Sequence, residues 1–401
     1  LAAVGATTAL IYLFTNLFIG ISLGANVLAA RYYAAGKHEE MSETVHTAMM
    51  FALISGIIMI FVGLFFSRLA LEIMGTPSDV IDQATLYMRI YFLGMPFFML
   101  YNYGAAILRA VGDTKRPLIF LIISGVVNAC LNMLLVIVFH LDVAGVAIAT
   151  VTSQFISCVL VIGCLYRTKS SYQLRFSRLK IRKEYLKPIC QVGIPAGIQS
   201  TVINFSNALL QSSVNSFGST TMAGYTAANN IFGFLYVTVN AVTQACMSFT
   251  SQNYGVGKWK RMDRVLIDCL ILSFVAMMIL GNSAYFFGPK LLTIYTSNSK
   301  VIQCGMEILL YTTVTYFLCG FMDLFPGALR GMGRSGVPMI LSIIGTVGTR
   351  IVWIFWIFPN HRSLDILFIS YPASWIITIV LQVICYYFVR KQLYAKMRAE
   401  A

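Results

Sequence analysis

The decapeptide LRAVGDTKRP at residues 108–117 returns as LRGMGRSGVP at residues 329–338, which is 221 positions later. Several separate segments at one fixed offset are typical of an internal repeat, and the chain is therefore predicted to contain two copies of one structural unit. Further pairs share this offset without a gap, namely Tyr33 with Tyr254, Gly36 with Gly257, Lys37 with Lys258, Met41 with Met262, and Val80-Ile81 with Val301-Ile302.

The composition places both copies in a lipid bilayer. Hydrophobic residues make up 58% of the 401 residues and charged residues only 11%, which leaves too little polar surface to cover a soluble protein of this size. Apolar runs of about 20 residues are long enough for a helix to cross the hydrocarbon core, so we predict an all-α polytopic membrane protein. Eleven such runs are present, at 6–30, 47–66, 83–107, 117–139, 143–165, 188–216, 222–249, 265–287, 303–328, 337–358 and 366–389.

The net charge of +14 is distributed in a way that orients the predicted helices. Of the 29 Lys and Arg residues, 23 lie in one alternating set of loops and ends, and only four lie in the other set. The positive-inside rule makes the basic set cytoplasmic. We therefore expect a multi-pass protein of the plasma (inner) membrane with a cytoplasmic C-terminus, which binds no nucleic acid. The basic set comprises 31–46, 108–116, 166–187, 250–264, 329–336 and 390–401.

The repeat predicts two lobes. The partner of residues 188–200 would precede Leu1, so we expect that the first helix of a twelve-span protein is missing and that eleven helices are visible. Because the two copies join on the cytoplasmic side and each full copy has an even number of spans, the predicted fold is a pair of pseudo-symmetric six-helix bundles, related as parallel repeats. The expected parts are an N-terminal lobe at 1–165 with five spans, a basic cytoplasmic linker at 166–187, a C-terminal lobe at 188–390 with six spans, and a cytoplasmic tail at 391–401.

Ionisable residues inside the spans are costly to bury and are therefore candidates for function. Most of the 15 acids fall in or next to predicted loops, which leaves Glu307 and Asp323 on one span, with Arg350 in the middle of the next. Asp323 precedes Arg330 by seven residues, about 10 Å along a helix, so it either couples transport or forms a salt bridge or cap-like contact with a loop cation. Glu307 is either functional or a snorkelling structural residue. Arg350 is a candidate counter-ion for either acid.

The sequence contains no group of residues typical of an enzyme. The four histidines stand at span ends or in loops without an HExxH motif, and the nine cysteines contain no CxxC pair and are expected to be free thiols. An intramembrane enzyme would need paired acids, a metal-ligand cluster or a nucleophile with its base. We therefore expect no cofactor other than a coupling ion, Na⁺ or H⁺, and keep an enzyme as the alternative from another functional class.

The motifs resemble those of the multidrug and toxin extrusion (MATE) family of secondary transporters. They are AARYYAAGK at 29–37, SQNYGVGK at 251–258, VAGVAIATVTSQ at 143–154 and VGIPAGIQ at 192–199, together with the two decapeptides. The resemblance covers essentially the whole chain. It implies a twelve-helix, two-lobed antiporter that exports small-molecule organic cations, drugs or metabolites across the bilayer in exchange for Na⁺ or H⁺. We expect a monomer.

One branch of the MATE family has an N-x-x-x-D pattern on the fourth span of this chain, and the sequence departs from it. The matching residues are Asn128 and Asn132, so an amide replaces the acid. The two amides share a helical face, and Thr150 and Gln154 continue a polar face on the next span. Neutral oxygens can ligate Na⁺, so we hypothesise a Na⁺ site at Asn128, Asn132 and Thr150, with Gln154 in the same oxygen cluster and an acid on the missing helix. The alternative is a set of inter-helical hydrogen bonds that hold the lobe together.

A second branch of the family carries sodium-site acids in the second half, and this sequence departs from that pattern too. No Asp or Glu lies between Glu184 and Asp263, and the position eleven residues before the repeat arginine is Cys319, one helical turn from Asp323. Asp323 is therefore a candidate for ion coupling without a clear family counterpart. Aromatic and Met side chains are expected to line the cavity, because they bind flat cations through cation–π and soft contacts. The polar candidates for the substrate cavity are Asn204, Asn207, Gln211, Glu307 and Arg350.

Two further transport interpretations stay open. A lipid-linked sugar flippase of the same superfamily would share the two-lobe plan, but it would need basic residues in the central cavity to bind pyrophosphate. Only Arg89 and Arg350 lie within the predicted spans. A channel would be excluded by uptake of substrate against a gradient. Export by antiport is therefore the favoured prediction.

Overall fold

The structure, a computed structural model, describes residues 2–400, with side chains described for residue 7, for 10–12 and for 14–395. Within this range the regular elements are all helices and no strand occurs, as the apolar runs predicted. The helices are α1 (Ala2–Ala34), α2 (His38–Ile73), α3 (Ile81–Leu93), α4 (Met95–Ala110), α5 (Lys115–Asn132), η1 (Met133–Val138), α6 (Asp142–Arg167), η2 (Phe176–Arg178), α7 (Lys183–Asn215), α8 (Ser219–Gly255), α9 (Trp259–Phe286), α10 (Gly288–Thr293), α11 (Ser299–Thr313), α12 (Tyr316–Gly331), α13 (Gly336–Ser342), η3 (Ile343–Gly348), α14 (Thr349–Val352), η4 (Trp353–Ile357) and α15 (Leu364–Glu400).

The all-α membrane fold is confirmed. Among the described residues, eight helices are long and apolar enough to cross a membrane, or ten spans if each of two bent helix pairs counts as one. The remaining predicted span, 188–216, coincides with α7, a helix of 33 residues that is not apolar enough to be counted with them. The number of eleven spans therefore stays a prediction.

The internal repeat is visible in the backbone. The helix pair α3 and α4 is bent by 48° at Gly94, and the pair α11 and α12 is bent by 45° in the corresponding part of the second copy, at Val314 and Thr315. The motif glycines Gly112 and Gly333 have φ values of 91° and 82°, a left-handed conformation that favours glycine. Each follows the end of its helix by two residues, so the decapeptide encodes the same helix end twice.

The chain divides into two compact units, Leu1–Ile198 and Gln199–Ala401. The division falls inside α7, eleven residues after the expected start of the C-terminal lobe at residue 188. Compactness does not decide where the repeat itself begins, so the expected limits of the lobes, linker and tail stay predictions.

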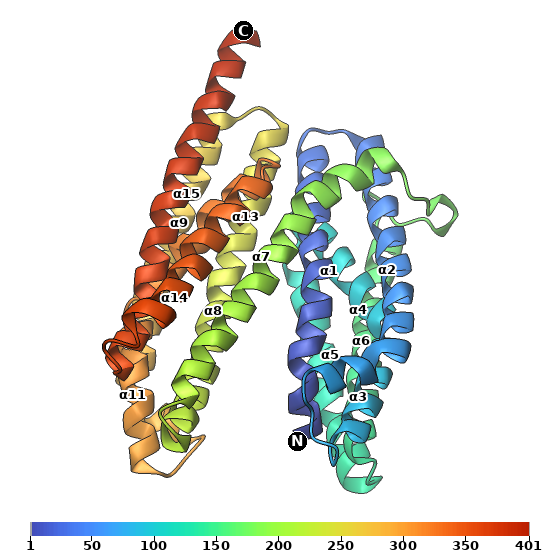
Figure 1. Cartoon of the computed structure of the whole chain (residues 1–401). Helices are drawn as coiled ribbons and strands as arrows, with labels where there is room; N and C mark the ends of the chain where they lie inside the picture. The colour runs from blue at the N-terminus through green and yellow to red at the C-terminus, as the bar shows by residue number, and fades with distance from the viewer. Residues whose placement is uncertain (1, 401) are drawn as a thin grey trace. The chain divides into compact units, whose positions relative to one another are not determined.

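In the first unit, α4 packs against α1, α2 and α6 (Figure 1). The N-terminal part of α7 meets α1 through small residues. A Cβ atom at Gly20 would collide with the backbone of Gly193 and Gly197, and one at Gly24 would collide with the backbone of Ile189. Helices approach this closely where a G-x-x-x-G spacing removes side chains from both surfaces. This glycine contact holds the first turns of α7 in the first unit.

The basic stretch between α6 and α7 is attached to the first turns of α2. The His46 ring donates from Nδ1 to the Ser42 carbonyl oxygen at 2.6 Å and accepts at Nε2 from the backbone N–H of Arg175 at 3.0 Å. The Arg182 guanidinium pairs with the Glu43 carboxylate at 2.6 Å. The stretch is therefore ordered against α2, although its composition alone suggests a mobile link.

In the second unit, α12 packs against α8, α9 and α15. Near one end of this packing, the Asp263 carboxylate on α9 joins three side chains of α15. It accepts hydrogen bonds from the hydroxyls of Tyr386 and Tyr394, each at 3.0 Å, and from Arg390 Nε at 2.9 Å. One acid thus fastens the C-terminal part of α15 to the start of α9.

Candidate functional site

The helical segment that carries Arg350 is irregular on both sides of this residue. α14 has only four residues, Thr349–Val352, and lies between the π-helical turns η3 and η4. A π-helical turn inserts an extra residue, and such turns are frequent at functional sites. The side chains between the two turns therefore point in directions that differ from those on an unbroken α-helix.

The Arg350 guanidinium is buried and held by neutral groups. The residue is 3% exposed. Nη1 donates to Asn207 Oδ1 on α7 at 2.7 Å, Nε donates to Ser374 Oγ on α15 at 3.3 Å, and the guanidinium carbon lies 4.8 Å from the centre of the Tyr371 ring. Among the described side chains Arg350 forms no ion pair, so its expected pairing with Glu307 or Asp323 is wrong. The arginine reaches across to α7 and α15, whereas these acids lie on α11 and α12.

Aromatic side chains extend this site. The Tyr371 and Tyr225 hydroxyls are 2.9 Å apart and hydrogen bonded. The Trp375 ring packs edge-on against Tyr316, with ring centres 5.7 Å apart, and its centre lies 5.9 Å from that of Tyr371. Rings of this kind present both apolar faces and polar tips to a ligand. We call the following residues the second-unit cluster: Asn207, Tyr225, Arg350, Tyr371, Ser374 and Trp375.

The first unit carries a polar cluster at the same place in the repeat. Ser374 follows Ser153 by 221 positions. Asn128 Nδ2 lies 3.4 Å from Ser153 Oγ, as Arg350 Nε lies 3.3 Å from Ser374 Oγ. Asn132 is the last residue before the π-helical turn η1, which mirrors η4 in the second copy. Two predicted residues of the first unit, Thr150 and Gln154, therefore correspond by the repeat offset to Tyr371 and Trp375 of the second-unit cluster.

The predicted Na⁺-site residues form only part of an oxygen cluster. Asn132 Nδ2 donates to Asn128 Oδ1 at 3.0 Å, while the Thr150 hydroxyl donates within its own helix to the Val146 carbonyl oxygen at 2.9 Å. Asn132 Oδ1 and Gln154 Oε1 are buried without a hydrogen-bond partner among the described residues. A buried acceptor without a partner is unfavourable, and amide oxygens are suitable ligands for a hard cation. Each of these two oxygens is thus an acceptor that the described residues leave unused.

The other predicted cavity residues do not all join the second-unit cluster. Asn207 contacts Arg350 directly. Asn204 is exposed and Gln211 is half-buried, and neither forms a hydrogen bond among the described residues. Glu307 on α11 lies near Tyr311, which is hydrogen bonded to Asp365. Two of the five candidates are therefore brought together, and the roles of all five stay predictions.

Asp323 on α12 is a half-buried carboxylate without an ion pair among the described side chains. It interacts electrostatically with Tyr236 on α8 and with Arg330. Arg330 instead donates from Nη2 to Gln199 Oε1 at 2.7 Å. The direct salt bridge that the sequence left open as an alternative is not formed. Asp323 therefore remains free to exchange a proton or to meet a cation.

Four of the six residues of the second-unit cluster were missed in the sequence, namely Tyr225, Tyr371, Ser374 and Trp375. Tyr371 and Trp375 could have been found, because they follow the candidates Thr150 and Gln154 by the repeat offset. Tyr225 carries no such signal, since its counterpart lies at residue 4 among ordinary apolar positions.

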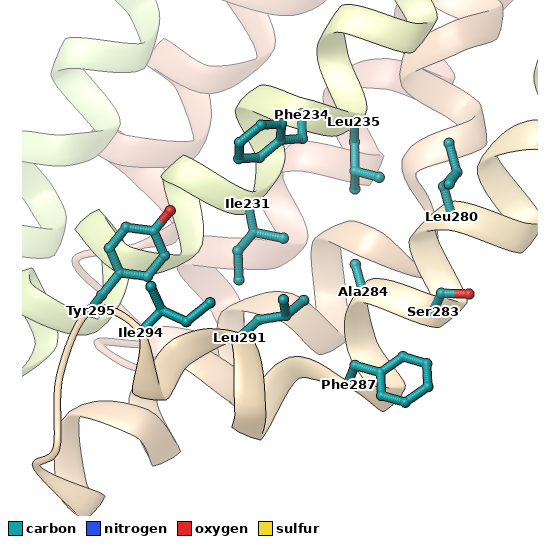
Figure 2. Close-up of a pocket in the computed structure, with 10 residues that line it drawn as sticks. All are labelled: Ile231, Phe234, Leu235, Leu280, Ser283, Ala284, Phe287, Leu291, Ile294 and Tyr295. Atoms are coloured by element: carbon teal, nitrogen blue, oxygen red, sulfur yellow. The ribbon is translucent and has the colours of Figure 1, made fainter. Parts of the chain in front are cut away.

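A separate apolar pocket of about 510 Å³ lies between α8, α9 and α10 (Figure 2). Its lining includes Phe234, Leu280, Phe287 and Ile294, with Ser283 and Tyr295 as polar members. None of the predicted site residues lines it, and it holds no ionisable acid or base apart from the tyrosine. It offers no group for ion coupling.

Comparison with known proteins places the chain in a family. The MatE family model matches residues 1–134 and 195–356. The chain is 28% identical over 402 residues to the probable multidrug resistance protein YoeA of Bacillus subtilis (strain 168), covering 98% of this chain and 86% of the relative. It is 23% identical over 330 residues to the multidrug export protein MepA of Staphylococcus aureus (strain NCTC 8325 / PS 47), covering 82% and 72%.

The fold agrees with these sequence relatives. A solved outward-facing multidrug resistance MATE family transporter of the MOP superfamily superposes with a TM-score of 0.89 at 19% identity, over 99% of this chain and 88% of that chain. A solved MATE structure in complex with MaL6 superposes with a TM-score of 0.90 at 20% identity, over 99% and 89%. Because the family model covers well over half of the sequence, the chain belongs to the MatE family of membrane-embedded multidrug efflux proteins, which are secondary transporters and not enzymes.

Proposed function

We propose that this chain is a cation-coupled antiporter, driven by Na⁺ or H⁺, that exports organic cations, drugs or metabolites by alternating access. The printed names of the relatives, which are multidrug resistance and multidrug export proteins, support this substrate class. We propose further that it works as a monomer in the plasma membrane with its C-terminus in the cytoplasm, as the distribution of basic residues predicts.

The observation that carries the proposal is the presence of buried oxygen atoms that lack partners. An antiporter needs a site that either the ion or the substrate occupies, and such a site must hold acceptors that the resting protein does not use. Asn132 Oδ1 and Gln154 Oε1 meet this condition in the first unit. Asp323 in the second unit is an acid without an ion pair among the described side chains. The neutral amides of the first unit favour Na⁺ as the coupling ion, whereas proton coupling requires the carboxylate of Asp323.

Vesicles that contain the purified full chain test the proposal. Export of ethidium, a flat organic cation, is measured with a Na⁺ gradient alone and with a proton gradient alone. If Na⁺ is bound at the first-unit cluster, Asn132→Ala removes the Na⁺-driven part, because it deletes a ligand oxygen. Cys130→Ala, at an exposed position on the same helix, serves as the control. Unchanged Na⁺ dependence in Asn132→Ala would contradict the Na⁺ site, and export under neither gradient would contradict antiport.

A further inference from the structure

The second unit holds more buried positive than negative charge around its polar interior. Asp323 interacts electrostatically with Arg330 and Tyr236, although it forms no direct ion pair with Arg330 among the described side chains. The groups that interact with Arg350 are Tyr371, Tyr225 and Cys319, together with Asn207 and Ser374. None of them is an acid. Arg350 is therefore a buried arginine that has no acid among its described contacts in this unit.

A buried arginine without a counter-ion is unfavourable by itself. Guanidinium stays protonated in proteins, so the charge cannot be relieved by losing a proton. Burial of an unpaired ion is unfavourable even after the surroundings relax. Hydrogen bonds to an amide and a hydroxyl reduce this cost without neutralising the charge. The arrangement is therefore one that an incoming anion would stabilise.

The arginine also keeps donors available for such an anion. Of the five guanidinium N–H groups, Nε uses one on Ser374 and Nη1 uses one on Asn207. Nη2 forms no hydrogen bond among the described residues, since the printed bonds of Arg350 use Nε and Nη1. The N–H groups of one guanidinium edge can bind a carboxylate through two parallel hydrogen bonds. Tyr371 and Trp375 provide aromatic surface beside it.

We infer that Arg350 binds the carboxylate of an aromatic molecule that the protein transports, so that its substrates include anionic or zwitterionic compounds as well as organic cations. This inference rests on the proposed function, because it takes the bound molecule to be a transported substrate. The carboxylate site itself can be tested by binding alone. The second-unit cluster then serves as the specificity-determining part of the substrate cavity. Asn207 accepts one hydrogen bond from Nη1 and so holds the guanidinium in place, while Nη2 keeps its donors without a partner among the described residues.

Binding to the purified full chain in detergent, measured by titration calorimetry, tests this inference. The probes are indole-3-acetate and tryptamine, which share the indole ring and carry opposite charges. We expect indole-3-acetate to bind more tightly than tryptamine. Arg350→Gln should weaken indole-3-acetate binding on the order of 10- to 100-fold, the loss of charge-assisted hydrogen bonds. Arg350→Lys should lie between, because it keeps the charge and loses the fork. Arg89→Gln, an exposed arginine in the first unit, should bind as the wild type does.

A second variant keeps the test valid if Arg350→Gln does not fold. Asn207→Asp places a carboxylate where Oδ1 already lies 2.7 Å from Nη1, so it should supply the counter-ion internally. We expect it to abolish indole-3-acetate binding and to raise the melting temperature. Unchanged indole-3-acetate binding in Asn207→Asp overturns the inference, as does tighter binding of tryptamine in the wild type. If inorganic phosphate or chloride binds as tightly as indole-3-acetate and displaces it, the site holds a free anion and the inference is also wrong.

The outcomes for this site and for the proposed function are separable, because binding requires no ion gradient. If indole-3-acetate binding depends on Arg350 but ethidium is not exported from vesicles, the proposed transport function is contradicted and the carboxylate site is supported. If ethidium is exported but indole-3-acetate does not bind, the proposed transport function is supported and the carboxylate site is contradicted.

Discussion

Arg350 on α14 donates a 2.7 Å hydrogen bond to Asn207 on α7, a residue 143 positions earlier in the chain. Both belong to the second compact unit. The bond is charge-assisted and partly buried, which makes it one of the stronger polar contacts available to a membrane helix pair. It ties α7 to the irregular helix and fixes the direction of the guanidinium.

Removal of the amide at this contact should destabilise the protein. Asn207→Ala is expected to lower the free energy of unfolding by about 1.5–3 kcal/mol, because a hydrogen bond to a charged group contributes about this much. The matched control is Asn204→Ala, one turn earlier on α7 at an exposed position, with an expected change within about 0.5 kcal/mol. Thermal unfolding in detergent gives both values. Equal changes in the two variants would show that the contact adds nothing to stability.

Asp323→Asn should uncouple export from the proton gradient. An amide cannot be ionised, so a carboxylate that carries the proton is lost while the shape of the side chain is kept. We expect proton-driven ethidium export in vesicles to fall at least about 10-fold, a loss equivalent to about 1.4 kcal/mol of coupling. Asp268→Asn is the control, because Asp268 is exposed and forms only an i, i+4 pair with Arg264. Wild-type export by Asp323→Asn would place the coupling group elsewhere.

The close contact between α1 and α7 should tolerate no added methyl group. Gly193→Ala introduces a Cβ that meets the backbone of Gly20 and Ile21, and separating the helices should cost about 1–3 kcal/mol. Gly163→Ala on α6 is the matched control, since nothing lies within 4 Å of its added Cβ. Alanine is favoured over glycine in a helix by about 0.5–1 kcal/mol, so this control should be neutral or stabilising. A lower melting temperature for Gly163→Ala than for Gly193→Ala would contradict the packing argument.

Asp263→Asn should loosen the C-terminal part of α15. The variant loses the ion pair with Arg390 and weakens two tyrosine hydrogen bonds. The Arg390 side chain is 46% exposed, so screening limits the expected loss to about 1–2 kcal/mol. Amide hydrogen exchange should rise in residues 386–394 and not elsewhere. Glu72→Gln, which breaks an exposed i, i+4 pair with Arg68, should leave exchange unchanged. Uniform exchange across α15 in Asp263→Asn would contradict a local fastening.

Much of the fold could be predicted because it depends on local patterns. Apolar runs of about 20 residues gave helices at every predicted span, since in lipid a chain satisfies its backbone hydrogen bonds internally. The decapeptide at 108–117 and its copy at 329–338 led to equivalent helix ends with a left-handed glycine. The bends in α3–α4 and α11–α12 were not predicted from the repeat, although Pro96, two residues after Gly94, is a physical cause for the first.

The sequence by itself determined that the chain is an all-helical membrane protein made of two copies of one unit, because length, apolarity and a fixed offset are properties of the chain alone. It also singled out Arg350 and Asp323 as ionisable residues within apolar spans, Asn207 as a polar residue of one span, and Asn128 and Asn132 by their resemblance to a family pattern. Only the tertiary structure decided that Arg350 meets Asn207 and not Glu307 or Asp323. The direction of a side chain depends on the rotation of its helix, which packing and the π-helical turns set, and no spacing along one helix reveals it.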